Sequence, residues 1–138
     1  MFATGVGIPI MASLNSALGQ QLGSPAAATF ALFVVGAVLS AVVLAVAGAP
    51  EWSRFTFERP WLYLGAAFIL FYALSITWAA PKIGVGNAIF FVLLGQLAAA
   101  ALIDHFGLLG ALKFELTARR VAGLVVMAVG VYLAKRTA

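Results

Sequence analysis

No charged side chain occurs between Phe2 and Ala49, and this run constrains the fold more than any other feature of the sequence. An α-helix rises about 1.5 Å per residue and a bilayer core is about 30 Å thick, so the run exceeds one membrane crossing. Only 9% of the 138 residues are charged, against about 25% in soluble chains. The sequence therefore predicts an all-α polytopic membrane protein.

Five spanning segments fit the pattern of apolar stretches and breaks. Ser24 is expected to cap the second segment, with Pro25 at its first helical position. The fifth segment is short, and it can span only if the charged residues at its two ends extend toward the interfaces. The predicted helices form one transmembrane domain, 1–138, and cover about 2–22, 26–46, 61–80, 85–103 and 119–135.

The first helix has one face of small and polar residues and one apolar face. At 100° per residue, the small and polar face contains Gly5, Pro9, Ala12, Asn15, Ser16, Gly19 and Gly23. In lipid such a face is expected to point toward protein or a water-filled path. The segment is expected to be a retained span rather than a cleaved signal, because no Lys or Arg precedes its apolar part.

Uncharged polar groups are the candidates for a functional path through the membrane. Tyr72 and Ser75 share a stripe of small and aromatic residues in the third helix, and Thr77 and Trp78 fall outside it. The predicted lining of a path for a small organic solute is Asn15, Ser16, Tyr72, Ser75 and Gln96. The same groups could instead hold helices together, at about 0.6–2 kcal/mol each. The residues alone leave both interpretations open.

Glycines at helical spacing predict close helix packing. The expected packing or dimer contacts are Gly36, Gly95, Gly123 and Gly130, each near a second small residue on the same helix.

The charged residues flank the spans and bear on topology. Five spans place Arg54, Arg59, Lys113, Arg119 and Arg120 on the N-terminal side of the membrane, and Lys82, Lys135 and Arg136 on the other. Five positive residues on the N-terminal side against three on the other favour a cytoplasmic N-terminus. Because the two counts are nearly balanced, they also fit insertion in both orientations. Lipid headgroups, not nucleic acid, are the expected partners of these charges. The connection that holds Trp52, Phe55 and Phe57 also suits the headgroup layer.

Catalytic chemistry is not indicated. Asp104 and His105 stand together at a predicted helix end and are expected to form a solvated terminus. The sequence lacks a phosphate-binding loop and metal-ligand spacing, so no enzyme activity, cofactor or metal is expected. The predicted membrane interior contains no ionisable acid, base or histidine, which leaves no buried carboxylate for proton exchange.

A set of motifs in chain order gives the sequence a family resemblance. The motifs are Pro9-xx-Ala12-xx-Asn15-xx-Leu18-Gly19, Gly23-Ser24-Pro25, Phe33-xx-Gly36, Ala80-Pro81-Lys82-Ile83-Gly84, Gly95-Gln96, Asp104-His105-Phe106-Gly107, Arg119-Arg120-Val121-Ala122-Gly123 and Gly130-Val131. With them, the chain resembles the short five-helix YdcZ-like family of inner-membrane exporters in the drug/metabolite transporter superfamily.

The resemblance implies half of a ten-helix transporter in the bacterial inner membrane. A five-helix chain would complete that bundle as an antiparallel homodimer or with a paralogous partner. The implied function is transport, as export, of a small organic solute by alternating access. Small multidrug-resistance relatives use a glutamate in the first helix, and this first helix has none. The alternative function is a non-transporting membrane scaffold or a regulatory subunit of a partner complex.

Overall fold

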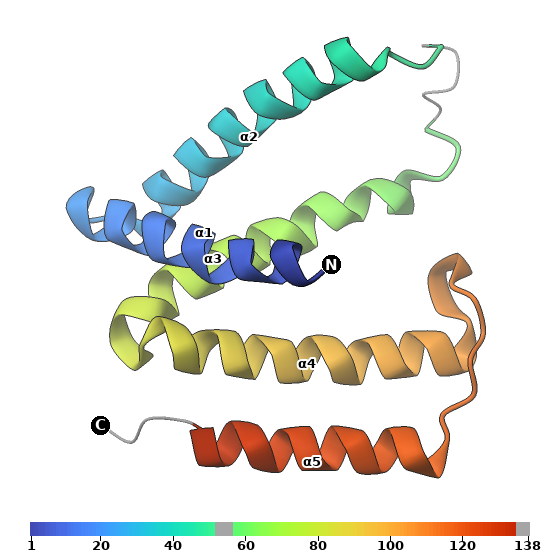
Figure 1. Cartoon of the computed structure of the whole chain (residues 1–138). Helices are drawn as coiled ribbons and strands as arrows, with labels where there is room; N and C mark the ends of the chain where they lie inside the picture. Colours follow the sequence, from blue (N-terminus) through green and yellow to red (C-terminus); the bar gives the residue numbers. More distant parts are fainter. Residues whose placement is uncertain (52–56, 135–138) are drawn as a thin grey trace. The chain divides into compact units, whose positions relative to one another are not determined.

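The computed structural model describes residues 1–51 and 57–134, which contain five α-helices and two 3₁₀ turns (Figure 1). The elements are α1 (Phe2–Gln21), α2 (Pro25–Ala47), η2 (Pro60–Leu64), α3 (Gly65–Ile83), α4 (Val85–Phe106), η3 (Leu108–Gly110) and α5 (Ala118–Ala134). Several residues with predicted interfacial or topological roles lie outside the described residues: Trp52, Arg54, Phe55, Lys135 and Arg136.

Four helical segments in the described part of the chain are long and apolar enough to cross a membrane. They are Phe2–Gln21, Pro25–Ala47, Pro60–Ile83 and Val85–Phe106, with mean hydropathies of 1.2, 2.8, 1.8 and 2.0. No strand occurs among the described residues. The predicted all-α polytopic membrane fold is therefore confirmed. At 17 residues α5 is shorter, about 26 Å of helix, and its crossing of the membrane stays a prediction.

The chain divides into two compact units, Met1–Lys82 and Ile83–Ala138. Close to the boundary, Gly84 adopts a φ of +86° between α3 and α4. Glycine adopts positive φ without the steric penalty that a Cβ brings, which explains its position at this break. The expectation of one transmembrane domain over 1–138 stays a prediction, and each unit is described by itself below.

In the first unit, a three-residue turn joins α1 to α2. Gly23 adopts a φ of +62°, and the Ser24 amide donates to the Gly19 carbonyl at 3.0 Å, which closes the end of α1. Ser24 Oγ then accepts a hydrogen bond from the Ala27 amide at 3.2 Å, and Pro25 is the first residue of α2. The predicted cap is therefore confirmed.

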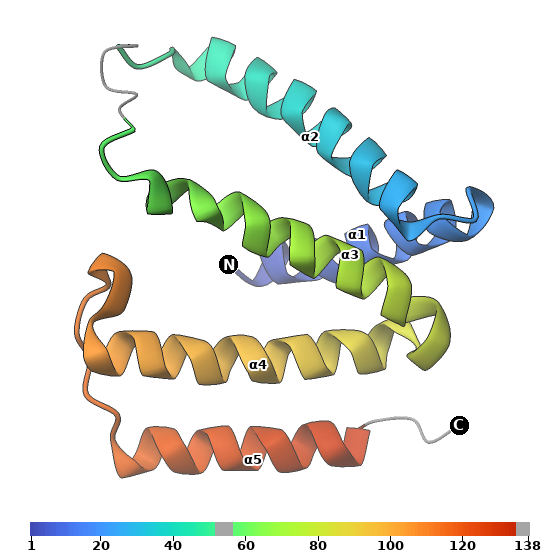
Figure 2. The same cartoon turned by 180° about the vertical axis from the view of Figure 1, so that it is seen from behind.

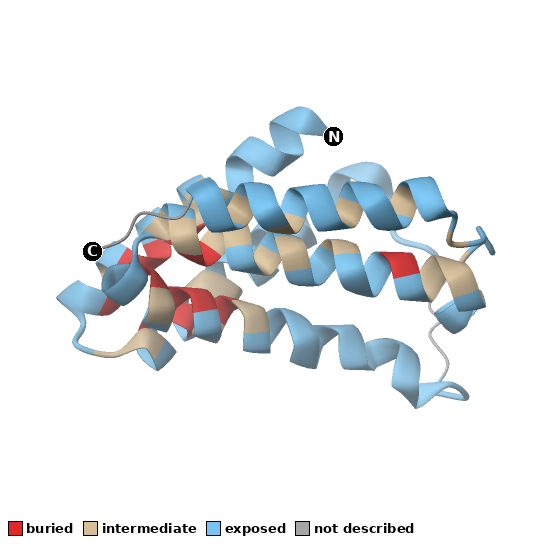
Figure 3. Cartoon of the chain, turned by 90° about the horizontal axis from the view of Figure 1, so that it is seen from below, coloured by how far each residue is buried: buried red, intermediate tan, exposed pale blue. Residues whose placement is uncertain are grey.

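The core of the first unit lies beside this turn. Its members come from the second half of α1, the first turns of α2 and the second half of α3, where most of the buried residues in Figure 3 gather. They are Ala12, Asn15, Ser16, Gly19, Ala28, Thr29, Ala73, Ile76, Thr77 and Ala80. The four from α1 all belong to its predicted small and polar face, so that face does point toward protein.

Gly19 allows the closest approach in this core. A methyl group in its place would lie 3.0 Å from Thr77 Cγ2, 3.6 Å from Pro25 Cα and 3.7 Å from Ala28 Cβ. These atoms belong to α3 and α2, so Gly19 marks the point where three helices meet. Small residues at such points let helix backbones approach and pack through van der Waals contacts.

In the second unit, α4 and α5 run side by side in opposite directions (Figures 1 and 2). Gly107 ends α4 in the left-handed conformation, with a φ of +62°. The connection then turns back, and the Phe114 amide donates to the Asp104 carbonyl at 2.8 Å. Thr117 Oγ1 accepts from the Arg120 amide at 3.2 Å and so caps the start of α5.

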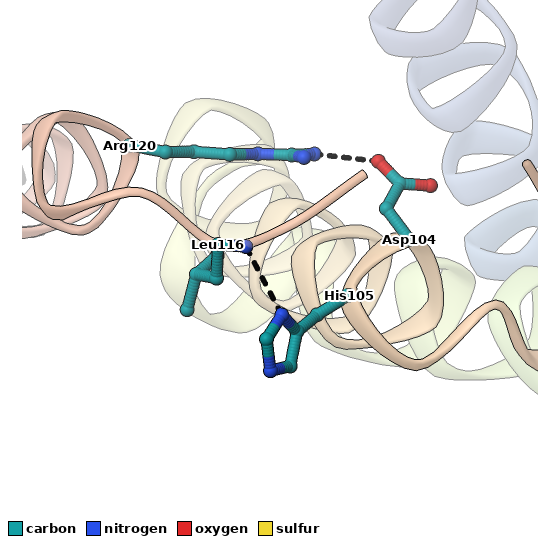
Figure 4. A network of polar contacts seen from close by, with 4 residues as sticks. All are labelled: Asp104, His105, Leu116 and Arg120. Carbon is teal, nitrogen blue, oxygen red and sulfur yellow. Dashed lines mark hydrogen bonds and ion pairs between the residues drawn. The ribbon is translucent and has the colours of Figure 1, made fainter. Parts of the chain in front are cut away.

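Two side chains in the last turn of α4 hold this connection (Figure 4). Asp104 Oδ2 pairs with an Arg120 guanidinium nitrogen at 2.6 Å. His105 Nδ1 accepts a hydrogen bond from the Leu116 amide at 3.0 Å. Both side chains lie at the helix end, as the sequence predicts. Both are half-buried and bound to the connection or to α5, so they hold this helix end while staying partly accessible to solvent.

Replacement of Gly19 by Ala should destabilise the first unit by about 1–3 kcal/mol relative to Gly5→Ala, because the added methyl group presses on Thr77, whose hydroxyl is bound to Asn15 and limits its movement. Gly5→Ala is the matched control, since nothing lies within 4 Å of a Cβ there and it shares helix α1. Thermal unfolding of both variants in detergent, followed by circular dichroism, measures the difference. Equal shifts in Tm would contradict the close contact at Gly19.

Replacement of Arg120 by Gln should lower Tm slightly more than Arg119→Gln, because only Arg120 pairs with Asp104 in the described chain. The side chains of Arg120 and Asp104 are 37% and 30% exposed, so solvent screening limits the difference in stability between the two variants to about 0–1 kcal/mol. Raising the salt concentration should reduce the gap between the two variants. A gap that is absent at low salt would show that the pair contributes nothing measurable.

Candidate functional site

One buried hydrogen bond joins α1 to α3 in the first unit. Asn15 Nδ2 donates to Thr77 Oγ1 at 2.6 Å, and the two residues are 4% and 1% exposed. In a bilayer, water cannot replace this partner, and such interhelical bonds contribute about 0.6–2 kcal/mol. Asn15 therefore has a packing role in this arrangement, and Thr77 is its partner.

Thr77 is the residue that the sequence reasoning missed. The buried face of α3 consists of Ala73, Ile76, Thr77 and Ala80, spaced i, i+3, i+4 and i+7. The stripe chosen from the sequence was centred on Tyr72 instead and excluded Thr77. A signal was present, because small residues at 73 and 80 flank a single polar residue on one helix face.

The other predicted path residues occupy different surroundings. Ser16 is buried next to Asn15 in the core, Tyr72 is half-buried, and Ser75 is exposed on α3. Gln96 is exposed on α4, in the second unit. The structure thus brings Asn15 and Ser16 into one core of the first unit, and Gln96 belongs to the second unit.

Three of the five predicted residues line cavities of the first unit. Asn15 lines a cavity of about 390 Å³ between α1 and α2, together with Met11 and Leu32. Tyr72 lines one of about 400 Å³, bounded by the same two residues and by Ser40. Ser75 lines a third, of about 690 Å³, whose walls include residues 23–26, at the end of the turn and the start of α2. Their sizes match those of small-molecule sites, 300–1,000 Å³.

These cavities carry no charge. None of their lining residues is Asp, Glu, Lys, Arg or His. Lys82 Nζ lies 3.3 Å from the ring centroid of Trp78, a wall of the third cavity, and Lys82 itself does not line that cavity. Among the described residues, no group of three His, Cys, Asp or Glu side chains could hold a metal. The cavities can therefore offer apolar contact and hydrogen bonds, without a charged partner.

The four glycines predicted to pack helices have open surroundings in this structure. A methyl group at Gly36, Gly95, Gly123 or Gly130 would meet nothing within 4 Å. They are therefore not at tight helix contacts within the described chain, in contrast to Gly19. Their predicted packing role would need a further neighbour.

Comparison with known proteins gives one match. The family model described as "Putative inner membrane exporter, YdcZ" matches residues 1–133 of the chain. No curated protein and no solved structure matched the chain in these comparisons. The match spans nearly the whole sequence and agrees with the motifs and with the apolar helices. The chain is thus a multi-pass protein of the inner membrane and belongs to the YdcZ family of exporters.

Proposed function

We propose that the chain is a transporter subunit that exports a small organic solute across the inner membrane by alternating access. The observation that carries the proposal is the polar core of the first unit, where Asn15, Ser16 and Thr77 are buried inside a membrane protein. Polar groups in membrane spans are costly, and their usual positions are helix interfaces and solute pathways. Uncharged cavities lie around this core, and Asn15 lines one of them.

The proposed path contains Asn15, Ser16, Tyr72, Ser75 and Gln96. Three of these residues line cavities of suitable size, which supports their contact with a solute. In this path the solute would be recognised by amide and hydroxyl groups. Proton exchange through a buried carboxylate is not part of the proposal, because the only acidic residue in a described helix is Asp104, in the last turn of α4.

Alternating access requires bodies that can move against each other around a site. The division of the chain into Met1–Lys82 and Ile83–Ala138 supports this, since each part is compact. Gly84, close to the boundary on the side of the second unit, breaks the chain between α3 and α4. Motion between two such units is therefore the proposed basis of transport.

A second protein chain would complete the transporter. We propose an antiparallel second copy, with a paralogous partner as the alternative. The open backbone at Gly36, Gly95, Gly123 and Gly130 supports this, because each could accept a helix from a neighbour. The nearly balanced count of positive charges, five against three, fits copies inserted in opposite orientations.

One observation favours the alternative function of a membrane scaffold or regulatory subunit. Asn15 uses its amide nitrogen to bind Thr77, as an interhelical tie would. If every buried polar group served this purpose, no solute path would be needed. The two functions differ in what the loss of Asn15 should do.

Asn15→Leu should reduce solute flux about tenfold or more with assembly preserved, because a hydrogen-bonding group is lost from the path. Thr77→Val is the matched variant, since it removes the same interhelical bond and leaves the Asn15 amide in place. Counterflow of labelled amino acids, sugars, nucleosides and aromatic alcohols into proteoliposomes measures flux, and crosslinking measures assembly. Equal loss of assembly in both variants, with no flux in the unmodified protein, would favour the scaffold.

Gly123→Leu should reduce crosslinking between copies at least severalfold, because a large side chain would block close approach of a neighbouring helix. Gly5→Leu is the control, a glycine of α1 that also has open surroundings and is not among the four glycines predicted at the contact between copies. Crosslinking in native membranes with tags on two co-expressed copies gives the readout. Unchanged crosslinking in Gly123→Leu would exclude α5 from the contact between copies.

A further inference from the structure

Two neighbouring cavities lie between α2 and α3 in the first unit, and Phe33 is a wall of both. The first, about 390 Å³, is also lined by Thr29, Phe30 and Leu70. The second, about 400 Å³, is the one that Tyr72 lines. We refer to these two cavities together as the α2–α3 groove.

Each cavity of the groove is lined by a residue whose buried hydroxyl group has no partner. Thr29 Oγ1 and Tyr72 Oη are both covered from solvent, and neither has a hydrogen-bond partner within the described chain. Thr29 as a whole is 1% exposed. A buried polar atom left without a partner costs about 1–3 kcal/mol, so such atoms are rare and call for an explanation.

Two serine hydroxyls in helices of the first unit do have a partner. Ser13 Oγ donates to the Pro9 carbonyl at 2.8 Å, and Ser40 Oγ donates to the Ala37 carbonyl at 2.9 Å. Both use a backbone carbonyl of their own helix, the common arrangement for a hydroxyl inside a helix. Thr29 departs from it, and the Tyr72 phenol, which cannot reach its own helix backbone, has no partner on another helix.

We infer that the α2–α3 groove binds an uncharged, largely apolar molecule that carries a hydrogen-bonding group, and that Thr29 and Tyr72 are its polar contacts. The molecule would displace the apolar atoms that now cover the two oxygens and would satisfy one or both of them. This inference rests on the proposed transport function and specifies the class of solute.

The walls of the groove argue for an uncharged occupant. Apart from the two unpartnered hydroxyls and Ser40, the lining is aliphatic or aromatic, and no residue with an acidic or basic side chain lines it. A charged group that entered would lose its hydration without gaining a counter-ion, which is strongly unfavourable. Aromatic rings such as Phe30 and Phe33 offer a cation some compensation, so a cationic compound must be included in the test.

Three compounds of similar size distinguish these classes: benzyl alcohol, benzoate and benzylammonium. Saturation-transfer NMR on the whole protein in nanodiscs, corrected with empty nanodiscs, should show binding of benzyl alcohol in preference to both ions. Thr29→Val and Tyr72→Phe should each weaken this binding about two- to tenfold, because each removes one hydrogen bond. Ser13→Ala is the control, since its hydroxyl is bonded within α1 and lines neither cavity.

Stability without the ligand separates binding from a structural role. Because the two hydroxyls are unpartnered, Thr29→Val and Tyr72→Phe should leave Tm unchanged or raise it. A lower Tm with unchanged affinity would overturn the inference, and so would tighter binding of benzylammonium than of benzyl alcohol.

Solute counterflow in proteoliposomes distinguishes this inference from the proposed function. One outcome is flux of a solute in the panel together with benzyl alcohol binding that neither variant changes. It would contradict binding in the α2–α3 groove and would still support the transport function. Weakened binding in both variants, with no flux of any solute, would support the groove and count against transport.

Discussion

The hydrogen bond between Asn15 and Thr77 is the interaction on which the first unit depends. In lipid, apolar side chains gain little by leaving the solvent, so van der Waals contact and interhelical hydrogen bonds must hold helices together. Gly19 brings the backbone of α1 close to Thr77, and the short turn at Gly23 fixes where α2 begins. The hydrogen bond of Asn15 and the close contact of Gly19 thus both involve Thr77, and the two α1 residues are one helical turn apart.

The sequence predicted the features that follow from local chemistry. Long uncharged stretches indicated the helices, Ser24 with Pro25 indicated the start of α2, and helical periodicity identified the buried face of α1. The stripe around Tyr72 does not coincide with the buried face of α3, which contains Ala73, Ile76, Thr77 and Ala80. Large aromatic residues of the third span, such as Trp61 and Phe68, are 57% and 73% exposed. In a bilayer, lipid solvates large apolar side chains as well as protein does, so only small and polar residues indicate a buried face.

Periodicity also cannot tell which surface covers a face. Gln96 was grouped with Tyr72 from the sequence, yet the two belong to different compact units. Gly95 and Gly123 share helical spacing with other small residues, as Gly19 does, but only Gly19 has a close neighbour in the described chain. The partner of a helix face depends on contacts between distant segments, or between chains, and one sequence does not determine them. The roles of these residues therefore remain proposals, unlike the fold class and the family.

The histidine at the end of α4 has a consequence for the connection that follows the helix. Because Nδ1 accepts the Leu116 amide, the ring in this arrangement must carry its hydrogen on Nε2 or lose the bond. The bond fixes one tautomer of the imidazole, and it satisfies a backbone amide that lacks a helical partner. A single side chain at the end of α4 thereby holds the backbone of the connection that leads to α5.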